Sequence, residues 1–227
     1  MRWWWRPAIL TAGSVVVIAV VVASLRLPVG SRTVWLEVLV IAASTGLLVA
    51  VTWWLAGRDG VPDRSIVLSW GLGSGWVLGA LWIAEIAFNN LTPHSISTAD
   101  ARGVLDDATW GLVGLVTVVV AAGVRVRTGR WRSGVRAGAW SGVASGLGAA
   151  VGGGLLVALF RPWVESDPLM LSEWEVQGAG LDLAAYVTRE TMAGVWGHLW
   201  VLGIVQGALL GVVGATVAGI VHRPRAA

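Results

Sequence analysis

GVRAGAWSGVASGLGAAVGGGLLVALF is the sequence of residues 134–160, and it carries no charge after Arg136. In an α-helix, residues four positions apart lie on nearly the same face, so its regularly spaced glycines form one bare row. Such a row lets a second backbone approach closely, which is typical of helix packing in membranes. The stretch is also long enough to cross a bilayer. We therefore predict a membrane helix that packs through Gly134, Gly138, Gly142 and Gly146.

Two other apolar segments repeat this glycine spacing. One row is formed by Gly71, Gly75 and Gly79, and the other by Gly203, Gly207 and Gly211. Small residues at these positions predict that the segments pack against neighbouring helices in lipid. The fold class expected from the sequence is therefore all-α. We predict one polytopic membrane helix bundle, a single integral membrane domain that spans residues 1–227.

The composition of the chain points to lipid as its solvent. Of its 227 residues, 56% are hydrophobic and 13% are charged, whereas soluble domains carry about 25% charged residues. The basic residues lie in short clusters between apolar runs, which favours membrane topology over a nucleic-acid groove. All 16 are arginines, and we take this as a hint of a GC-rich bacterial genome. The chain has no cysteine, which excludes disulfide bonds and a catalytic thiol.

Six apolar segments predict six crossings, at residues 8–25, 33–56, 66–88, 108–124, 134–160 and 195–221. A cleaved secretory signal peptide is the alternative for the first segment, which is long for one and lacks a clean cleavage site. In the acidic connection 161–190, Ser166-Asp167-Pro168 is a helix-start signal and predicts a short interfacial helix. Residues 182–192 are expected to extend the last crossing.

The distribution of arginine predicts the orientation, because cytoplasmic connections carry the excess of basic residues. With both termini placed inside, the inner segments hold Arg2, Arg6, Arg58, Arg64, Arg125, Arg127, Arg130, Arg132, Arg136, Arg223 and Arg225. The outer segments then hold Arg26, Arg32, Arg102, Arg161 and Arg189. We therefore predict a multi-pass protein of the cell (inner) membrane with both termini cytoplasmic.

Glu37 and Glu85 are the only acidic residues inside the predicted crossings, each near the outer end of its segment. Intramembrane ionisable residues face protein or a water-filled cavity and often mark ion or substrate paths. One interpretation is a site for an ion, a proton or a polar substrate that opens outward. The other is structural, with the acids paired with Arg26 or Arg32.

His198 lies at a similar predicted depth and completes a set of two carboxylates and one imidazole with Glu37 and Glu85. Such ligands suit Zn, Mn or Fe, but no metal-binding spacing supports the set, and no metal or other cofactor is assigned. The alternative is an interfacial histidine hydrogen-bonded to a loop carbonyl.

Two further features fall within the crossings. Gly152, Gly153 and Gly154 weaken a helix, and an unwound turn there is one hypothesis because transporters bind ions at such breaks. The alternative is close packing without unwinding. Gln206 is polar and deep in the last crossing, where an interhelical hydrogen bond is expected.

The sequence leaves three classes of function open. The first is a non-enzymatic, permease-like bundle or a membrane subunit of a larger complex. The second is an intramembrane enzyme with an outward-facing carboxylate and histidine site, although no nucleophile–base or metal motif supports it. The third is an assembly protein that docks a partner through residues 161–190. The expected partners are the lipid bilayer and protein subunits, and nucleic acid is not among them.

Overall fold

The structure is a computed structural model that describes residues 5–27, 32–58, 62–92, 98–178 and 180–221. Both chain ends, which the sequence predicts to be cytoplasmic, lie outside the described residues. The described part is helical, and it contains six helical runs long and apolar enough to cross a membrane, which suggests a multi-pass membrane protein. They are α1 (Trp5–Leu25), α2 (Arg32–Gly57), α3 (Arg64–Leu91), α4 (Ala99–Thr128), α5 (Trp131–Glu165) and a continuous run of α7 (Leu183–Gly197), η1 (His198–Gln206) and α8 (Gly207–Val221).

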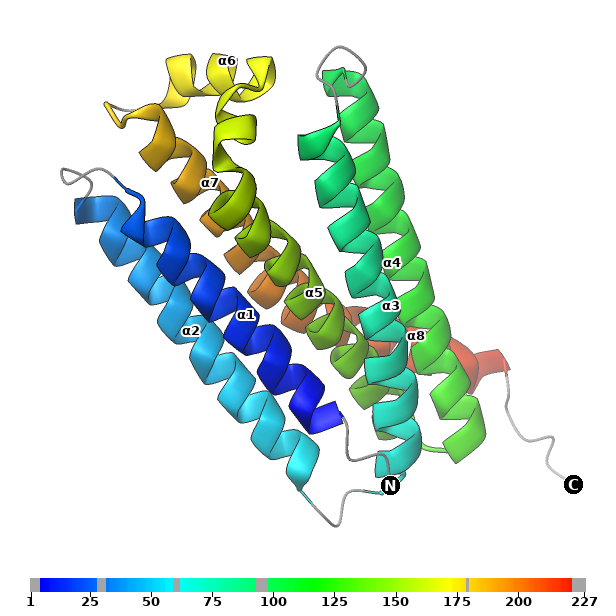
Figure 1. Cartoon of the computed structure of the whole chain (residues 1–227). Helices are drawn as coiled ribbons and strands as arrows, with labels where there is room; N and C mark the ends of the chain where they lie inside the picture. Colours follow the sequence, from blue (N-terminus) through cyan, green and yellow to red (C-terminus); the bar gives the residue numbers. More distant parts are fainter. Residues whose placement is uncertain (1–4, 28–31, 59–61, 93–97, 179, 222–227) are drawn as a thin grey trace, which may run out of the picture.

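Helix α5 is the central element of the bundle (Figure 1). It packs against α1, α3, α4, α7, η1 and α8, and most of its side chains are buried. The α1–α2 pair lies on one side of α5, and the α3–α4 pair lies on the other (Figure 1). We call the end at which α2 ends and α3 and α5 begin the arginine end, and the opposite end, crossed by the short helix α6 (Pro168–Gln177), the α6 end.

The outward faces of the helices are apolar. Ile18 on α1 is 62% exposed, Val77 on α3 is 70% exposed, and Leu115 on α4 is 61% exposed. Single exposed apolar residues are ordinary in soluble proteins, but these belong to a set distributed over α1 to α5, η1 and α8. Apolar outer faces around a bundle with backbone bonds satisfied inside each helix suit a lipid environment.

The glycine rows lie where backbones approach most closely. An added Cβ atom at Gly71 would lie 2.7 Å from the carbonyl oxygen of Ala137, and one at Gly75 would lie 2.5 Å from that of Ser141. These contacts join α3 to α5. On another face of α5, Gly138 and Gly142 lie against glycines of η1 and α8, namely Gly203, Gly207 and Gly211. Side chains larger than hydrogen do not fit at these contacts without displacing backbone.

Helix α4 begins earlier than the sequence predicts, and the last run begins with its predicted extension. α4 begins at Ala99 rather than at residue 108, because the Thr98 side chain accepts a hydrogen bond from the Ala101 amide at 3.2 Å and caps the helix. The polar residues before 108 were therefore wrongly assigned to a connection. The last run begins at Leu183 rather than at 195, and Asp182 caps it, in agreement with the predicted extension.

The short helix predicted in the connection 161–190 is present as α6. Asp167 is its N-cap and accepts a hydrogen bond from the Leu169 amide at 3.1 Å, with Pro168 in the first turn. The hypothesis of an unwound turn at Gly152–Gly154 is wrong, since α5 continues through these buried glycines. The space that they leave is used for packing: a Cβ at Gly153 would lie 2.7 Å from Val195.

Candidate functional site

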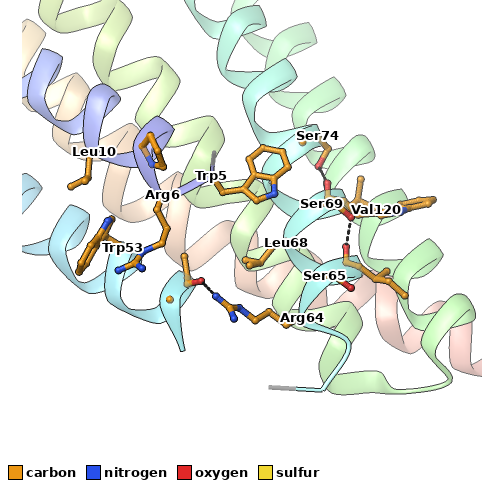
Figure 2. A pocket seen from close by; sticks show the side chains of 16 residues that line it. Trp5, Arg6, Leu10, Trp53, Arg64, Ser65, Leu68, Ser69, Ser74 and Val120 are labelled. Carbon is orange, nitrogen blue, oxygen red and sulfur yellow. Dashed lines mark hydrogen bonds between the residues drawn. The ribbon is translucent and has the colours of Figure 1, made fainter. Parts of the chain in front are cut away.

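A large cavity opens at the arginine end, between the first turns of α1, the end of α2 and the first half of α3. Its volume is about 1440 Å³. Arg6 and Trp53 line one side of it, and the guanidinium carbon of Arg6 lies 3.7 Å from the centre of the Trp53 ring (Figure 2). The other side carries serines of α3, including Ser69 and Ser74 (Figure 2). Apolar side chains, among them Leu10 and Leu68, form more of the lining than these polar groups do.

Ser74 connects this cavity to the centre of the bundle. Its Oγ atom lies 3.1 Å from the Oγ atom of Ser141 on α5, within hydrogen-bond distance. Ser145 follows Ser141 by four residues and therefore lies on the same face of α5, one turn closer to the α6 end. Both α5 serines are buried. The three hydroxyl groups lead from the wall of the large cavity into the helix core.

Three rings meet at the next level, one from each of three helices. The His198 ring of η1 lies edge-on to Trp82 of α3, with ring centres 4.9 Å apart. It stacks on Trp110 of α4 at 5.5 Å and 29°. The two tryptophan rings touch each other at 4.6 Å. His198 is partly exposed and packs against the rings of both tryptophans.

The hydrogen bond of His198 defines its tautomer. Nδ1 lies 2.8 Å from the carbonyl oxygen of Gly194, and a carbonyl only accepts, so Nδ1 carries the hydrogen. This leaves Nε2 as the nitrogen that can bind a proton. The alternative predicted from the sequence is a hydrogen bond from His198 to a loop carbonyl. A bond to a carbonyl is present, but the carbonyl belongs to the preceding helical turn.

A small cavity of about 10 Å³ adjoins the rings, and a space of this size holds about one water molecule. Thr117, Ser145 and Gln206 contribute polar groups to its wall. The Thr117 hydroxyl donates to its own helix, whereas the Ser145 hydroxyl has no hydrogen-bond partner among the described residues. No interhelical hydrogen bond of Gln206 is seen in the described part of the chain. We name Trp82, Trp110, Thr117, Ser145, His198 and Gln206 the His198 cluster.

The backbone of η1 shapes this cluster. Residues His198–Gln206 form a π-helix, a conformation that is rare and frequent at functional sites. The wider turn reaches the glycine row of α5, where a Cβ at Gly146 would lie 2.7 Å from the carbonyl oxygen of His198. Because Gly146 and Gly203 have no side chains, the π-helix can pack closely against α5. The irregular segment predicted at Gly152–Gly154 is found in this helix instead.

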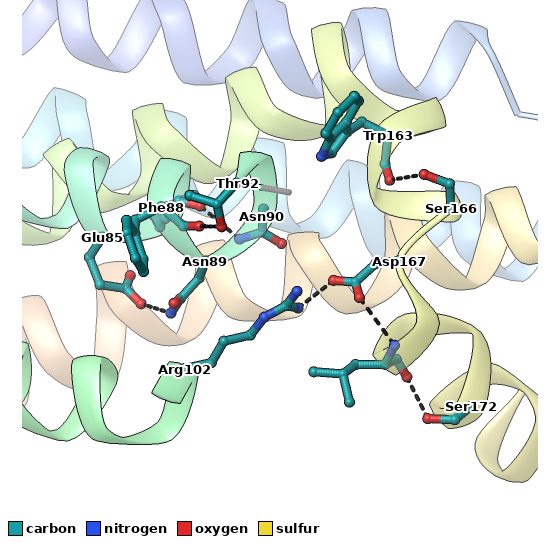
Figure 3. A network of polar contacts seen from close by, with 12 residues as sticks. Glu85, Phe88, Asn89, Asn90, Thr92, Arg102, Trp163, Ser166, Asp167 and Ser172 are labelled. Carbon is teal, nitrogen blue, oxygen red and sulfur yellow. Dashed lines mark hydrogen bonds and ion pairs between the residues drawn. The ribbon is translucent and has the colours of Figure 1, made fainter. Parts of the chain in front are cut away.

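Acidic groups lie on the α6 side of the rings. Glu85 follows Trp82 by three residues on α3 and is only 7% exposed. It accepts a hydrogen bond from the Asn89 side chain, whose own oxygen has no partner among the described residues (Figure 3). Asp106 precedes Trp110 by four residues, which places it on the same face of α4. Carboxylates from α3 and α4 thus follow the His198 cluster toward the end of the bundle.

An ion pair joins α4 to the connection between α5 and α6 at the α6 end. Arg102 of α4 binds the carboxylate of Asp167, which also caps α6 (Figure 3). Asp167 is buried, so the pair joins α4 to the α5–α6 connection with little exposure to solvent.

The structure does not bring Glu37 together with Glu85 and His198. The Glu37 carboxylate on α2 accepts a hydrogen bond from Arg189 of α7 at 3.1 Å, and both side chains are nearly half exposed. α2 lies across α5 from α3 (Figure 1). Within the described ranges, no three His, Asp or Glu side chains form a group that could hold a metal ion. The partner of Glu37 is thus neither of the arginines that the sequence suggested.

Several residues between the large cavity and Glu85 are not among the site residues predicted from the sequence. Trp82 is one of them, and Asp106 lies before the predicted crossing at 108–124. The signals were the four-residue spacings of Ser141 with Ser145 and of Asp106 with Trp110, together with the Thr98 cap that makes Asp106 helical. Comparison with protein-family models, curated proteins and solved structures returns no match, so the site is interpreted from its own residues.

Proposed function

We propose that this chain is a permease-like integral membrane protein that conducts protons along the path from the large cavity to Glu85. The observation that carries the proposal is a series of polar groups at successive levels of the bundle. It runs from Ser74 and Ser141 through the His198 cluster to Glu85 and Asn89. Polar groups inside a membrane bundle are costly and mark ion or proton paths.

The narrowness of the path favours protons over larger substrates. The cavity beside His198 holds about one water molecule, so an organic substrate does not fit there. An imidazole can take up a proton on one ring nitrogen and release one, and Nε2 of His198 is the nitrogen not bonded to Gly194. The step needs only the making and breaking of N–H and O–H bonds. No enzyme activity is invoked.

The orientation belongs to the same proposal. Arginine is concentrated at the end where the large cavity opens, and the positive-inside rule places that end in the cytoplasm. Glu85 and α6 then lie toward the outside of the cell membrane. The cytoplasmic cavity serves as the entrance for water, and the acids serve as the outer exchange groups.

Flux measurements test the proposal. The purified protein is reconstituted into vesicles that contain a pH-sensitive dye, and a potassium gradient with valinomycin supplies the driving force. We expect proton uptake above that of protein-free vesicles, and its loss in His198→Gln and in Glu85→Gln. Glu37→Gln is the matched control, because its carboxylate pairs with Arg189 away from the path.

Three results would contradict the proposal. Wild-type vesicles that take up protons no faster than protein-free vesicles would remove the activity. Equal proton uptake by the wild-type protein and both variants would show that protons do not pass through His198 and Glu85. A flux that requires a sodium gradient would move the assignment from protons to sodium ions.

A further inference from the structure

A second recess at the arginine end has a different chemical character from the large cavity. It is a groove of about 600 Å³ between the second half of α2 and the faces of α3, α5 and η1. Val51 and Leu55 of α2, Val143 of α5 and Ile204 of η1 form its apolar walls. Its volume falls within the range of about 300–1,000 Å³ that is typical of ligand sites. No member of the His198 cluster lines it, but Arg64 and Leu68 line both this groove and the large cavity.

The polar lining of the groove is basic. Arg58 follows α2, Arg64 begins α3 and Arg136 lies near the start of α5, so their backbones are all at the arginine end. None of the described lining residues is acidic. The nearby carboxylate of Asp63 accepts a hydrogen bond from Ser133 at 2.9 Å and lies 3.6 Å from Arg130. Arg64 donates a hydrogen bond to the Ala56 carbonyl oxygen, and Arg58 stacks on Trp54 at 4.1 Å with its edge left for other contacts. Arg58 and Arg136 are thus the exposed basic groups of the groove.

Trp200 adds a hydrogen-bond donor within the apolar part. It lines the groove from η1, and its indole Nε1 atom is buried without a partner among the described residues. Buried indole N–H groups usually find an acceptor, because leaving one unpaired costs free energy. Because Nε1 itself has almost no accessible surface, a ligand in the groove contacts the Trp200 ring rather than this donor.

We propose that the groove binds one anionic phospholipid from the surrounding bilayer. An acyl chain lies along the apolar walls, and the phosphate lies beside Arg58 and Arg136. Guanidinium groups bind phosphate oxygens through paired hydrogen bonds and favour headgroups with net negative charge. Free phosphate would use the arginines but leave the apolar walls unused. A zwitterionic lipid would leave the positive charge unbalanced.

Thermal unfolding in detergent tests this site with defined probes. A ligand that binds only the folded state raises the melting temperature as its concentration rises. We expect such a rise with phosphatidylglycerol and no rise with phosphatidylcholine or inorganic phosphate. The double variant Arg58→Gln, Arg136→Gln should lose the rise, since both side chains are exposed and their removal leaves the core intact. Arg132→Gln is the matched control, an exposed arginine of α5 that does not line the groove.

A second measurement guards against a variant that fails to fold. Wild-type protein is cross-linked in phosphatidylglycerol vesicles to a lipid with a photoactivatable acyl chain, and the labelled peptides are mapped. Labels concentrated on the groove-facing residues of α2 and η1 support the site. Labels spread evenly over the outer faces of α1 and α4 overturn it. So does an equal rise in melting temperature for the double variant and Arg132→Gln, or a rise with inorganic phosphate alone.

Discussion

The buried hydroxyl groups of this bundle are of two kinds. Ser24 and Thr117 donate to carbonyl oxygens four residues earlier in their own helices, at 2.7 and 2.8 Å. This local bond is the ordinary way for such residues to be satisfied inside a helix. Ser145 and Thr45 are buried and have no partner among the described residues. Ser145 adjoins the small cavity, so its hydroxyl group is available to a water molecule or a proton carrier there.

At the residue scale, alanine substitution tests the closest backbone contact. A Cβ at Gly142 would meet the carbonyl oxygen of Gly203 and lie 2.7 Å from the Cα atom of Gly207. We expect Gly142→Ala to lower the unfolding free energy by about 1–3 kcal/mol, because overpacking forces the backbones apart. The measurement is thermal unfolding in detergent.

Gly111→Ala is the control for this prediction. An added Cβ at Gly111 of α4 meets nothing within 4 Å. Because alanine favours a helix over glycine by up to about 1 kcal/mol, this variant should be neutral or more stable. Equal melting temperatures for the two variants would show that the glycine row does not pack closely.

At the element scale, the wide π-helical turn and the glycine row of α5 depend on each other. Gly142 and Gly146 admit the backbone of η1, and η1 brings His198 to the tryptophans of α3 and α4. The other end is held by α6 and its connection to α4 through Asp167. Helix ends and close contacts, rather than loops, thus position the polar groups.

Asp167 has two separable roles, and paired variants distinguish them. Asn is as good an N-cap as Asp but lacks the charge that pairs with Arg102. We expect Asp167→Ala to destabilise α6 by about 1 kcal/mol more than Asp167→Asn, because only alanine removes the cap. Limited proteolysis within residues 168–177 measures the difference. Equal cleavage of both variants would show that the ion pair alone orders α6.

At the scale of the whole molecule, the charges at the two ends define the proposed threading. Cysteine substitution tests it cleanly, because the chain has no cysteine of its own. With the arginine end inside, Arg132→Cys should resist an impermeant thiol reagent in intact cells, whereas Ser172→Cys of α6 should react. Both positions are exposed in the structure, so burial does not confuse the result.

Permeabilised cells supply the control for this labelling, and both cysteines should react in them. The neighbouring Ser133 is a poor reporter, since it is buried and bonded to Asp63. Labelling of Arg132→Cys but not of Ser172→Cys in intact cells would reverse the threading.

Local spacing along the chain was enough to predict the long apolar helices, the short helix after Asp167 and the helical extension after Asp182. Each of these depends on neighbours within one or two turns, so the sequence contains the whole signal. The candidate site depends on contacts between distant helices. Glu37 meets Arg189 across 152 residues, and His198 meets rings of α3 and α4. These contacts depend on how each helix is rotated and shifted against α5. The π-helical turn changes the rotation of its own helix, and no local pattern in the sequence specifies it.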